Sequence, residues 1–202
     1  VRGYNSPFTL LCTYSSTTDT TNLLTVHNPT SIFTYFTFPR SLKLINLSGS
    51  ILADSATILS PLSGQNLVGL TTLSPINHVV SCTATTCVGN LAVAPHTHMW
   101  TLNLPSNLAS KNVLSNMQNN KFVLAIGSDI KIFGVLDTLP NQVPVIMSTI
   151  ALGAPATAFA ISDDSMYIQL AHLLIRYSFM DHHVTLRVQR AVDHPRLSVQ
   201  HA

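Results

Sequence analysis

The stretch TTNLLTVHNPTSIFTYFTFPRSLKLINL, residues 20–47, decides the fold class. It contains three short apolar runs that are rich in β-branched and aromatic residues, which favour strands. The turn formers NPTS at residues 28–31 separate the first two runs. We therefore predict strands at Leu23–His27, Ile32–Phe38 and Leu42–Leu47.

The same rhythm of a short apolar run and a turn cluster continues along the chain. It predicts further strands at Phe8–Tyr14, Leu67–Leu73, Val79–Thr83, Met99–Leu104, Phe122–Ile126, Ile130–Leu136 and Val184–Val188. Many short strands with few helices favour an all-β sandwich or barrel. No internal repeat and no Gly/Ser linker stands out. We expect one domain over residues 1–202, with a C-terminal extension or arm from about residue 138.

Two segments carry helical signals. Ser106 or Asn107 can cap the segment LASKNVLSNM, and its apolar residues have partly helical spacing, so we predict one short helix over Leu108–Met117. Residues 163–179 fit a helix that begins at two Asp residues, or a strand. We favour the strand because the segment is rich in aromatic and β-branched residues.

The chain is poor in charge. Charged residues make up 9% of its 202 residues, against roughly 25% in ordinary globular proteins, and Glu is absent. Hydrophobic residues make up 46%. Charge is also depleted in the buried core of subunit interfaces. We therefore expect neighbouring subunits to cover much of this chain.

The three cysteines cannot all pair within one chain. A reducing compartment is the simpler expectation, and for Cys82 and Cys87 we favour two buried thiols over a small disulfide loop. The chain begins at Val1 with no initiator Met and no signal segment. We expect a proteolytic product or a trimmed chain.

Residues 138–162 carry no charge and approach the length that spans a membrane. Pro144, Gly153 and Pro155 interrupt this stretch, and Ser and Thr dilute it. We expect a buried stretch between strands, or an interface arm, and no contact with a membrane.

The cysteines combine with two histidines in the pattern C-x4-C-x8-H-x-H, formed by Cys82, Cys87, His96 and His98. On a strand, residues two apart face the same side, so both imidazoles could reach one metal. The spacing matches no established zinc pattern, however, and Pro95 indicates a loop. We expect a loop pair or an interface pair, with no metal and no cofactor.

The sequence DHH at Asp181–His183 invites a catalytic interpretation, with Ser165 or Ser178 as a nucleophile. On a strand, Asp181 and His183 share a face that His182 does not. No G-x-S-x-G elbow, Gly-rich phosphate loop or paired acidic site accompanies them. We therefore expect no catalytic residue, and a protein that is not an enzyme.

Three stretches of the sequence follow one another in a familiar order: residues 20–47, NLVGLTTLSPIN at 66–77, and HMWTLNLPSNLASKNVLSNMQNNKFVLAIGS at 98–128. Together they resemble the jelly-roll coat proteins of small icosahedral positive-strand RNA viruses. The rhythm is most similar to that of the tymovirus coat protein, and picorna-like capsid proteins are the second choice. The resemblance covers roughly residues 20–128 and rests on pattern.

The resemblance implies an antiparallel β-sandwich, an eight-stranded viral jelly roll, that self-assembles into an icosahedral shell. Its partners would be copies of itself, possibly other capsid proteins, and genomic RNA. It would lie in the virion, after assembly in the host cell cytoplasm. The rival hypothesis is a β-sandwich module that binds a receptor or a glycan, such as a spike or lectin-like domain.

The C-terminal quarter is the basic end of the chain. For a capsid subunit we expect it to hold RNA through non-specific phosphate contacts, which weaken as salt rises. The alternative is an exterior or inter-subunit arm whose Arg residues pair with Asp. The candidate RNA-binding residues are Arg176, Arg187, Arg190, Arg196, His182 and His183.

Overall fold

In a computed structural model of the chain, the described residues form strands and turns and no helix. The structure describes residues 2–5, 9–13, 21–28, 30–36, 40–46, 50–53, 62, 65–105, 114–117, 120–136, 138–161, 165–171, 173–178 and 184–188.

The described strands form five antiparallel sheets, each made of consecutive strands. A two-stranded sheet comes first, with β1 (Arg2–Asn5) and β2 (Thr9–Thr13). The next two sheets contain β3 (Thr21–Asn28), β4 (Ser31–Phe36), β5 (Ser41–Asn46) and β6 (Ile51–Ala53), then β7 (Gly69–Leu73), β8 (His78–Cys82), β9 (Thr86–Leu91) and β10 (His98–Asn103). The last two contain β11 (Leu114–Met117), β12 (Lys121–Ile126), β13 (Asp129–Gly134) and β14 (Val145–Ala151), then β15 (Ala158–Ile161), β16 (Ser165–Gln169), β17 (Leu173–Ser178) and β18 (Val184–Val188).

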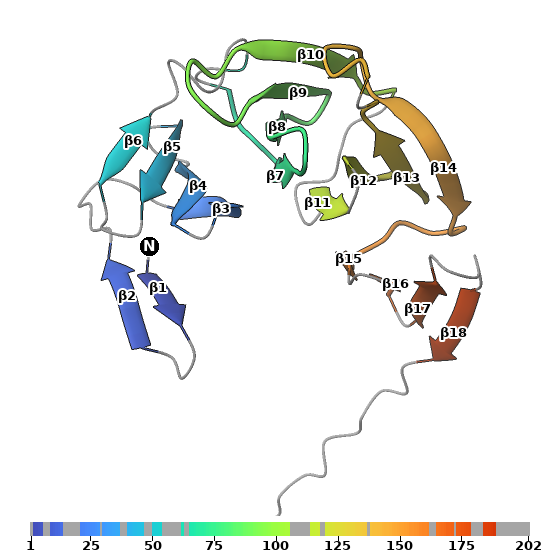
Figure 1. Cartoon of the computed structure of the whole chain (residues 1–202). Coiled ribbons are helices and arrows are strands. Elements are labelled where there is room, and N and C mark those ends of the chain that lie inside the picture. Colours follow the sequence, from blue (N-terminus) through green and yellow to red (C-terminus); the bar gives the residue numbers. More distant parts are fainter. Residues whose placement is uncertain are drawn as a thin grey trace, which may run out of the picture.

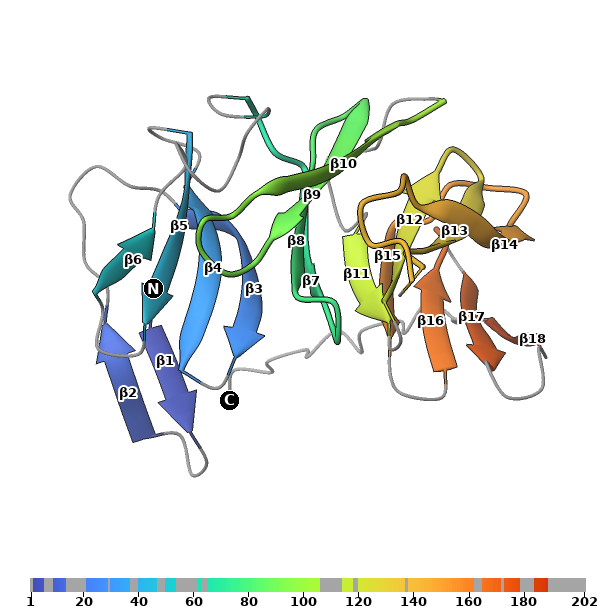
Figure 2. The ribbon, with the colours of Figure 1, turned by 45° about the horizontal axis from the view of Figure 1, so that its top comes forward.

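The four-stranded sheets stand side by side around an arc, in chain order (Figures 1 and 2). The first strand of each sheet lies on the inside of the arc, where β3 contacts β7, β7 contacts β11, and β11 contacts β15. The last strands, β6, β10, β14 and β18, lie on the outside. The inner strands begin 48, 45 and 44 residues apart. The chain therefore repeats one structural unit, although its sequence shows no repeat.

Apolar side chains fill the space between neighbouring sheets. Three buried clusters lie along the arc, one at each junction between four-stranded sheets. Successive residues of one strand belong to different clusters: Phe122 of β12 packs toward the sheet of β7–β10, and Val123 toward the sheet of β15–β18. Both faces of the two middle sheets, β7–β10 and β11–β14, are therefore buried.

An aromatic stack joins the sheet of β7–β10 to that of β11–β14. The Trp100 ring stacks on Phe122, with centroids 5.9 Å apart and planes within 4°. Phe122 in turn stacks on Phe133, with centroids 5.3 Å apart. Trp100 pairs across the strands with Gly89, where a Cβ atom would collide with the indole ring. Because Gly89 has no side chain, the Trp100 ring can lie directly over the backbone of β9.

The all-β, antiparallel prediction is confirmed, and the strand prediction for residues 163–179 is confirmed by β16 and β17. The predicted helix is wrong where the structure describes it: Leu114–Met117 forms β11, and residues 106–113 lie outside the described residues. The reason is strand pairing, because Leu114 lies opposite Leu124 of β12, and this long-range contact overrides the local helical spacing.

The uncharged stretch that begins at residue 138 forms a loop, β14 and β15. Within the described ranges, the chain contains no long apolar helix of the kind that spans a bilayer.

The contact between Gly89 and Trp100 makes a testable prediction. Gly89→Ala should lower the free energy of unfolding by about 1–3 kcal/mol, because the added methyl group forces Trp100 out of its stack. Gly127→Asn is the control, since nothing lies near a Cβ atom there and Asn tolerates its φ of 61°. Urea unfolding of both variants checks the prediction, and equal losses would contradict it.

Candidate interaction surface

Exposed aliphatic side chains gather on and before β14. Of the ten large hydrophobic residues that the described part of the chain exposes, six lie between residues 136 and 147. We call these six the β14 patch: Leu136, Leu139, Val143, Val145, Ile146 and Met147, each 42–54% exposed. Apolar groups that cluster on a surface mark a site of contact with another molecule more often than single exposed residues do.

Local structure explains why these side chains point outward. The Leu139 N–H donates to the Leu136 carbonyl, and the Gln142 N–H donates to the Leu139 carbonyl, both at 3.0 Å. These two successive turns hold the loop before β14. In β14, Ile146 pairs with Phe133 and Ser148 pairs with Ile132, so Met147 is an extra, bulged residue. The Met147 side chain lies over Gly134, where its Cγ would come within 2.9 Å of a Cβ atom.

The other outer strands are shorter or more polar. β6 has three residues, of which Ile51 and Leu52 are exposed. β10 has polar residues at both ends, His98 and Asn103, and buries Trp100. β18 contains Arg187. β14, with seven residues and no charge, is the longest of the described outer strands.

His78 is a fully buried titratable residue of the core. Its Nδ1 accepts a hydrogen bond from the Trp100 Nε1–H at 3.2 Å, so its proton resides on Nε2, which has no hydrogen-bond partner among the described residues. Burial disfavours the charged imidazolium and lowers the pKa of His78 from 6.5 to about 4. This contact stabilises the sheet, and nothing about it indicates catalysis.

The cysteine and histidine pattern does not form a metal site. Cys82 and Cys87 are buried and joined by a disulfide, with Cα atoms 4.1 Å apart. His96 Nδ1 bonds to the Leu91 carbonyl at 3.0 Å, and the exposed His98 bonds to Asn90 and Thr101. No group of three potential metal ligands exists among the residues that the structure describes.

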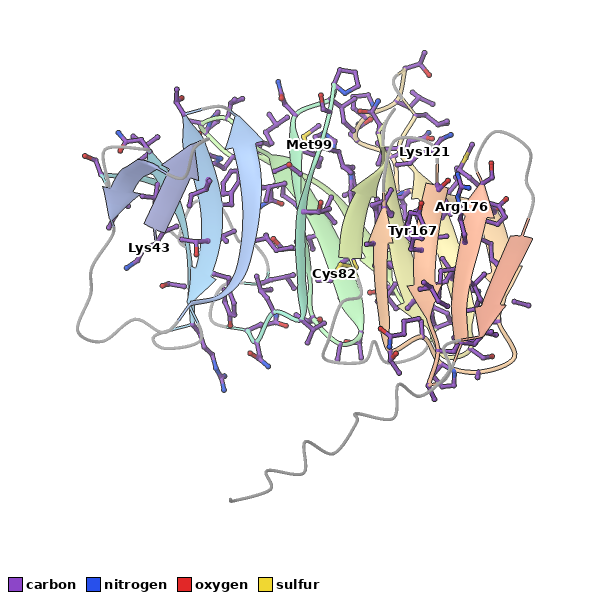
Figure 3. All side chains as sticks on the ribbon, turned by 90° about the horizontal axis from the view of Figure 1, so that it is seen from below. Lys43, Cys82, Met99, Lys121, Tyr167 and Arg176 are labelled. Atoms are coloured by element: carbon purple, nitrogen blue, oxygen red, sulfur yellow. A yellow bond between two sulfur atoms is a disulfide. The ribbon has the colours of Figure 1, made fainter. Side chains whose placement is uncertain are left out.

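The expectation of two free thiols is therefore wrong for Cys82 and Cys87 (Figure 3). The reason is register: the two residues lie directly opposite each other at the last pair of β8 and β9. Their spacing of five residues in sequence was the available signal, because a tight hairpin brings such residues together.

The basic C-terminal quarter is described only in part. Arg176 of β17 is exposed, lies opposite Tyr167 of β16, and donates from Nε to the buried Ser165 hydroxyl at 3.0 Å (Figure 3). Arg187 lies opposite Leu174 in β18, and its side chain is outside the described part. His182, His183, Arg190 and Arg196 lie outside the described residues, as does all of Asp181–His183. RNA binding by these residues stays a prediction.

No protein-family model and no curated protein matches the sequence. Solved structures do match. The chain is similar to U3-55K, with a TM-score of 0.63, 11% identity, and coverage of 85% of this chain and 52% of that one. It is also similar to the β-propeller domain of Myceliophteria thermophila Cps50 (Swd1), with a TM-score of 0.64, 9% identity, and coverage of 84% and 60%. A third match is a chain of the mitotic checkpoint complex, with a TM-score of 0.58, 12% identity, and coverage of 83% and 51%.

These structures are WD40 β-propellers. The four-stranded sheets have the fold of propeller blades. The chain spans about half the length of the structures that it matches. The spacing of 44 to 48 residues between inner strands is close to the repeat of roughly 40–45 residues that is typical of WD40 blades.

The resemblance to viral jelly-roll coat proteins is therefore wrong, and so is the capsid function that it implied. A jelly roll folds its strands into two facing sheets through Greek-key connections. Here each sheet contains four consecutive strands, such as β3-β4-β5-β6. The rival sandwich module fails for the same architectural reason. Location in a virion rested only on that resemblance and stays untested.

The propeller has one signal in the sequence, and it is indirect. Continuous apolar runs such as VVSC at 79–82 and FVLAI at 122–126 indicate strands that are buried on both faces. The WD dipeptide of propeller repeats is absent, since Thr101 follows the only tryptophan, Trp100. Without that dipeptide, a repeat is visible only in the strand positions.

The disulfide makes a second prediction. The double variant Cys82→Ala, Cys87→Ala should lose about 2 kcal/mol of unfolding free energy, because the disulfide closes a loop of only six residues in the unfolded chain. Cys12→Ala is the control and should keep the disulfide. Alkylation of the unfolded, unreduced protein should label Cys12 alone. Labelling of all three cysteines without reductant would contradict the prediction.

His78 makes a third prediction. Its folded pKa of about 4 lies below the unfolded value of about 6.5, so the unfolded state binds more protons between these pH values. Its contribution to stability is complete above pH 6.5 and is lost as the pH falls toward 4, by up to about 3 kcal/mol. Urea unfolding from pH 7.5 to 4 should show a shallower pH dependence for His78→Asn than for the wild type. An unchanged slope would contradict this role.

Proposed function

We propose that this chain is a non-catalytic scaffold that binds other proteins. The observation that carries the proposal is the β14 patch, an exposed apolar surface on the outer edge of a blade. Its six side chains lie close together in sequence and are held by paired turns and a strand, so the surface is ordered before a partner binds.

The propeller fold supports the proposal. WD40-type propellers are usually scaffolds without catalysis, because the radial blades present many edges and loops to partners. One of the similar structures, the mitotic checkpoint complex, is by its name an assembly. A function inferred from fold rests on analogy, and the β14 patch adds an observation from this chain itself.

Crosslinking in cells that express the chain tests this function. An amine-reactive crosslinker, followed by mass spectrometry, should join partner proteins to Lys121 and Lys131, which lie in the same blade as the patch. Lys43, in the sheet of β3–β6, is the internal comparison. The Gly89→Ala variant, whose core is disturbed, should capture fewer partners. Absence of any reproducible crosslinked protein would contradict the scaffold function.

A further inference from the structure

On the basis of this scaffold function, we propose that β14 binds an extended, apolar segment of a partner protein that carries no positive charge. The segment would pair with the outer edge of β14 and become a fifth strand of that blade. Its apolar side chains would cover the β14 patch.

The backbone of β14 supplies the first argument. β14 is the last strand of its sheet and pairs with β13 on one side only. No other described strand lies along its second side, which faces the outside of the arc (Figure 1). An edge strand presents a row of N–H and C=O groups that an extended peptide can pair with.

The side chains of β14 supply the second argument. Natural edge strands are usually protected by charge, by proline or by shortness. β14 has seven residues, contains neither charge nor proline, and exposes Val145, Ile146 and Met147 by 45–54% each. Leu136, Leu139 and Val143 extend the apolar surface beyond the strand. Alternate side chains of an added strand would contact this surface and be removed from water with it.

Charge defines the partner. No charged residue occurs from 138 to 162, and the charged side chains that the structure describes in β12 and β13 are Lys121, Asp129 and Lys131. Asp129 and Lys131 pair with Ala151 and Thr149, toward the far end of β14 from the patch, whereas Lys121 lies opposite Gly134, beside Met147. A Lys or Arg of the partner placed on the patch would lose its hydration and would meet the like charge of Lys121. The segment therefore carries no positive charge where it contacts Val145–Met147.

The bulge at Met147 argues against a second copy of the chain. Antiparallel pairing of two β14 strands about Ser148 would place a bulge in both strands of one short ladder. A single strand pair also buries less surface than the roughly 1,200 Å² at which stable protein interfaces begin. A flexible segment of another protein adapts to one bulge, and a weak, transient contact does not need an interface of that size.

Binding of a defined peptide tests the inference. The probe is a fluorescent, capped peptide in which Val and Thr alternate, and fluorescence anisotropy with the full chain measures its affinity. Wild-type protein should bind this probe at least about tenfold more tightly than the same peptide with Lys in place of Val. A probe with alternate backbone amides methylated should lose binding, because it cannot form the strand ladder.

Two matched variants locate the binding site. Ile146→Lys places a charge in the patch and should weaken binding about tenfold or more, whereas Leu52→Lys on the outer strand β6 should leave it within about twofold. The two residues are exposed by 54% and 55%, so the variants cost similar stability. Thermal unfolding checks this. If Ile146→Lys does not fold, Val145→Thr replaces it and should weaken binding several-fold.

Equal loss in both variants, unchanged binding of the methylated peptide, or no preference for Val over Lys would each overturn the inference. A wild-type dimer in sedimentation that Ile146→Lys converts to monomer would also overturn it, because a second copy would then be the occupant. Crosslinked partners at Lys43 alone, together with a failed peptide test, would leave the scaffold function standing and reject only the β14 site.

Discussion

Burial between neighbouring sheets is the interaction on which the rest of this structure depends. A four-stranded sheet with apolar side chains on both faces is not stable alone and must have a neighbour on each side. In β12, Phe122 and Val123 are fully buried although they point to opposite faces. In β8, Val79 and Val80 show the same behaviour. This two-sided burial places the sheets side by side around the arc.

The aromatic stack shows how one junction is made specific. Trp100 reaches from β10 across Gly89 to donate to His78, and its other side receives Phe122. The position of Trp100 thus depends on the missing side chain of Gly89, on the buried neutral imidazole of His78 and on the stacked ring of Phe122. The disulfide between Cys82 and Cys87 joins the opposite end of β8 to β9 in the same sheet. This blade is consequently held by its core and by a covalent bond.

β14 contributes no buried residue to these clusters, whereas β10 contributes Trp100, so the outer strands differ from blade to blade. β14 combines length, absence of charge and exposed aliphatic residues, whereas β6 is short and β10 is capped by polar residues. Residues 138–162 carry no charge, and β14 is the part of this stretch that lies on an outer edge. Under the proposed scaffold function, such an outer edge would bind a partner without a change in the core.

The sequence by itself determined the strand content, because alternating turn formers and β-branched or aromatic runs act locally. All ten predicted strands lie on or near observed strands and needed only such local signals; these strands are β2, β3, β4, β5, β7, β8, β10, β12, β13 and β18. Only the tertiary structure decided which strands pair, because pairing depends on contacts between distant residues. Leu114 entered β11 against Leu124 in spite of helical spacing, and Cys82 met Cys87 through the register of a hairpin. The exposure of the β14 patch could not be predicted from the sequence either. An apolar run has the same sequence pattern whether another strand covers it or it lies on an open edge.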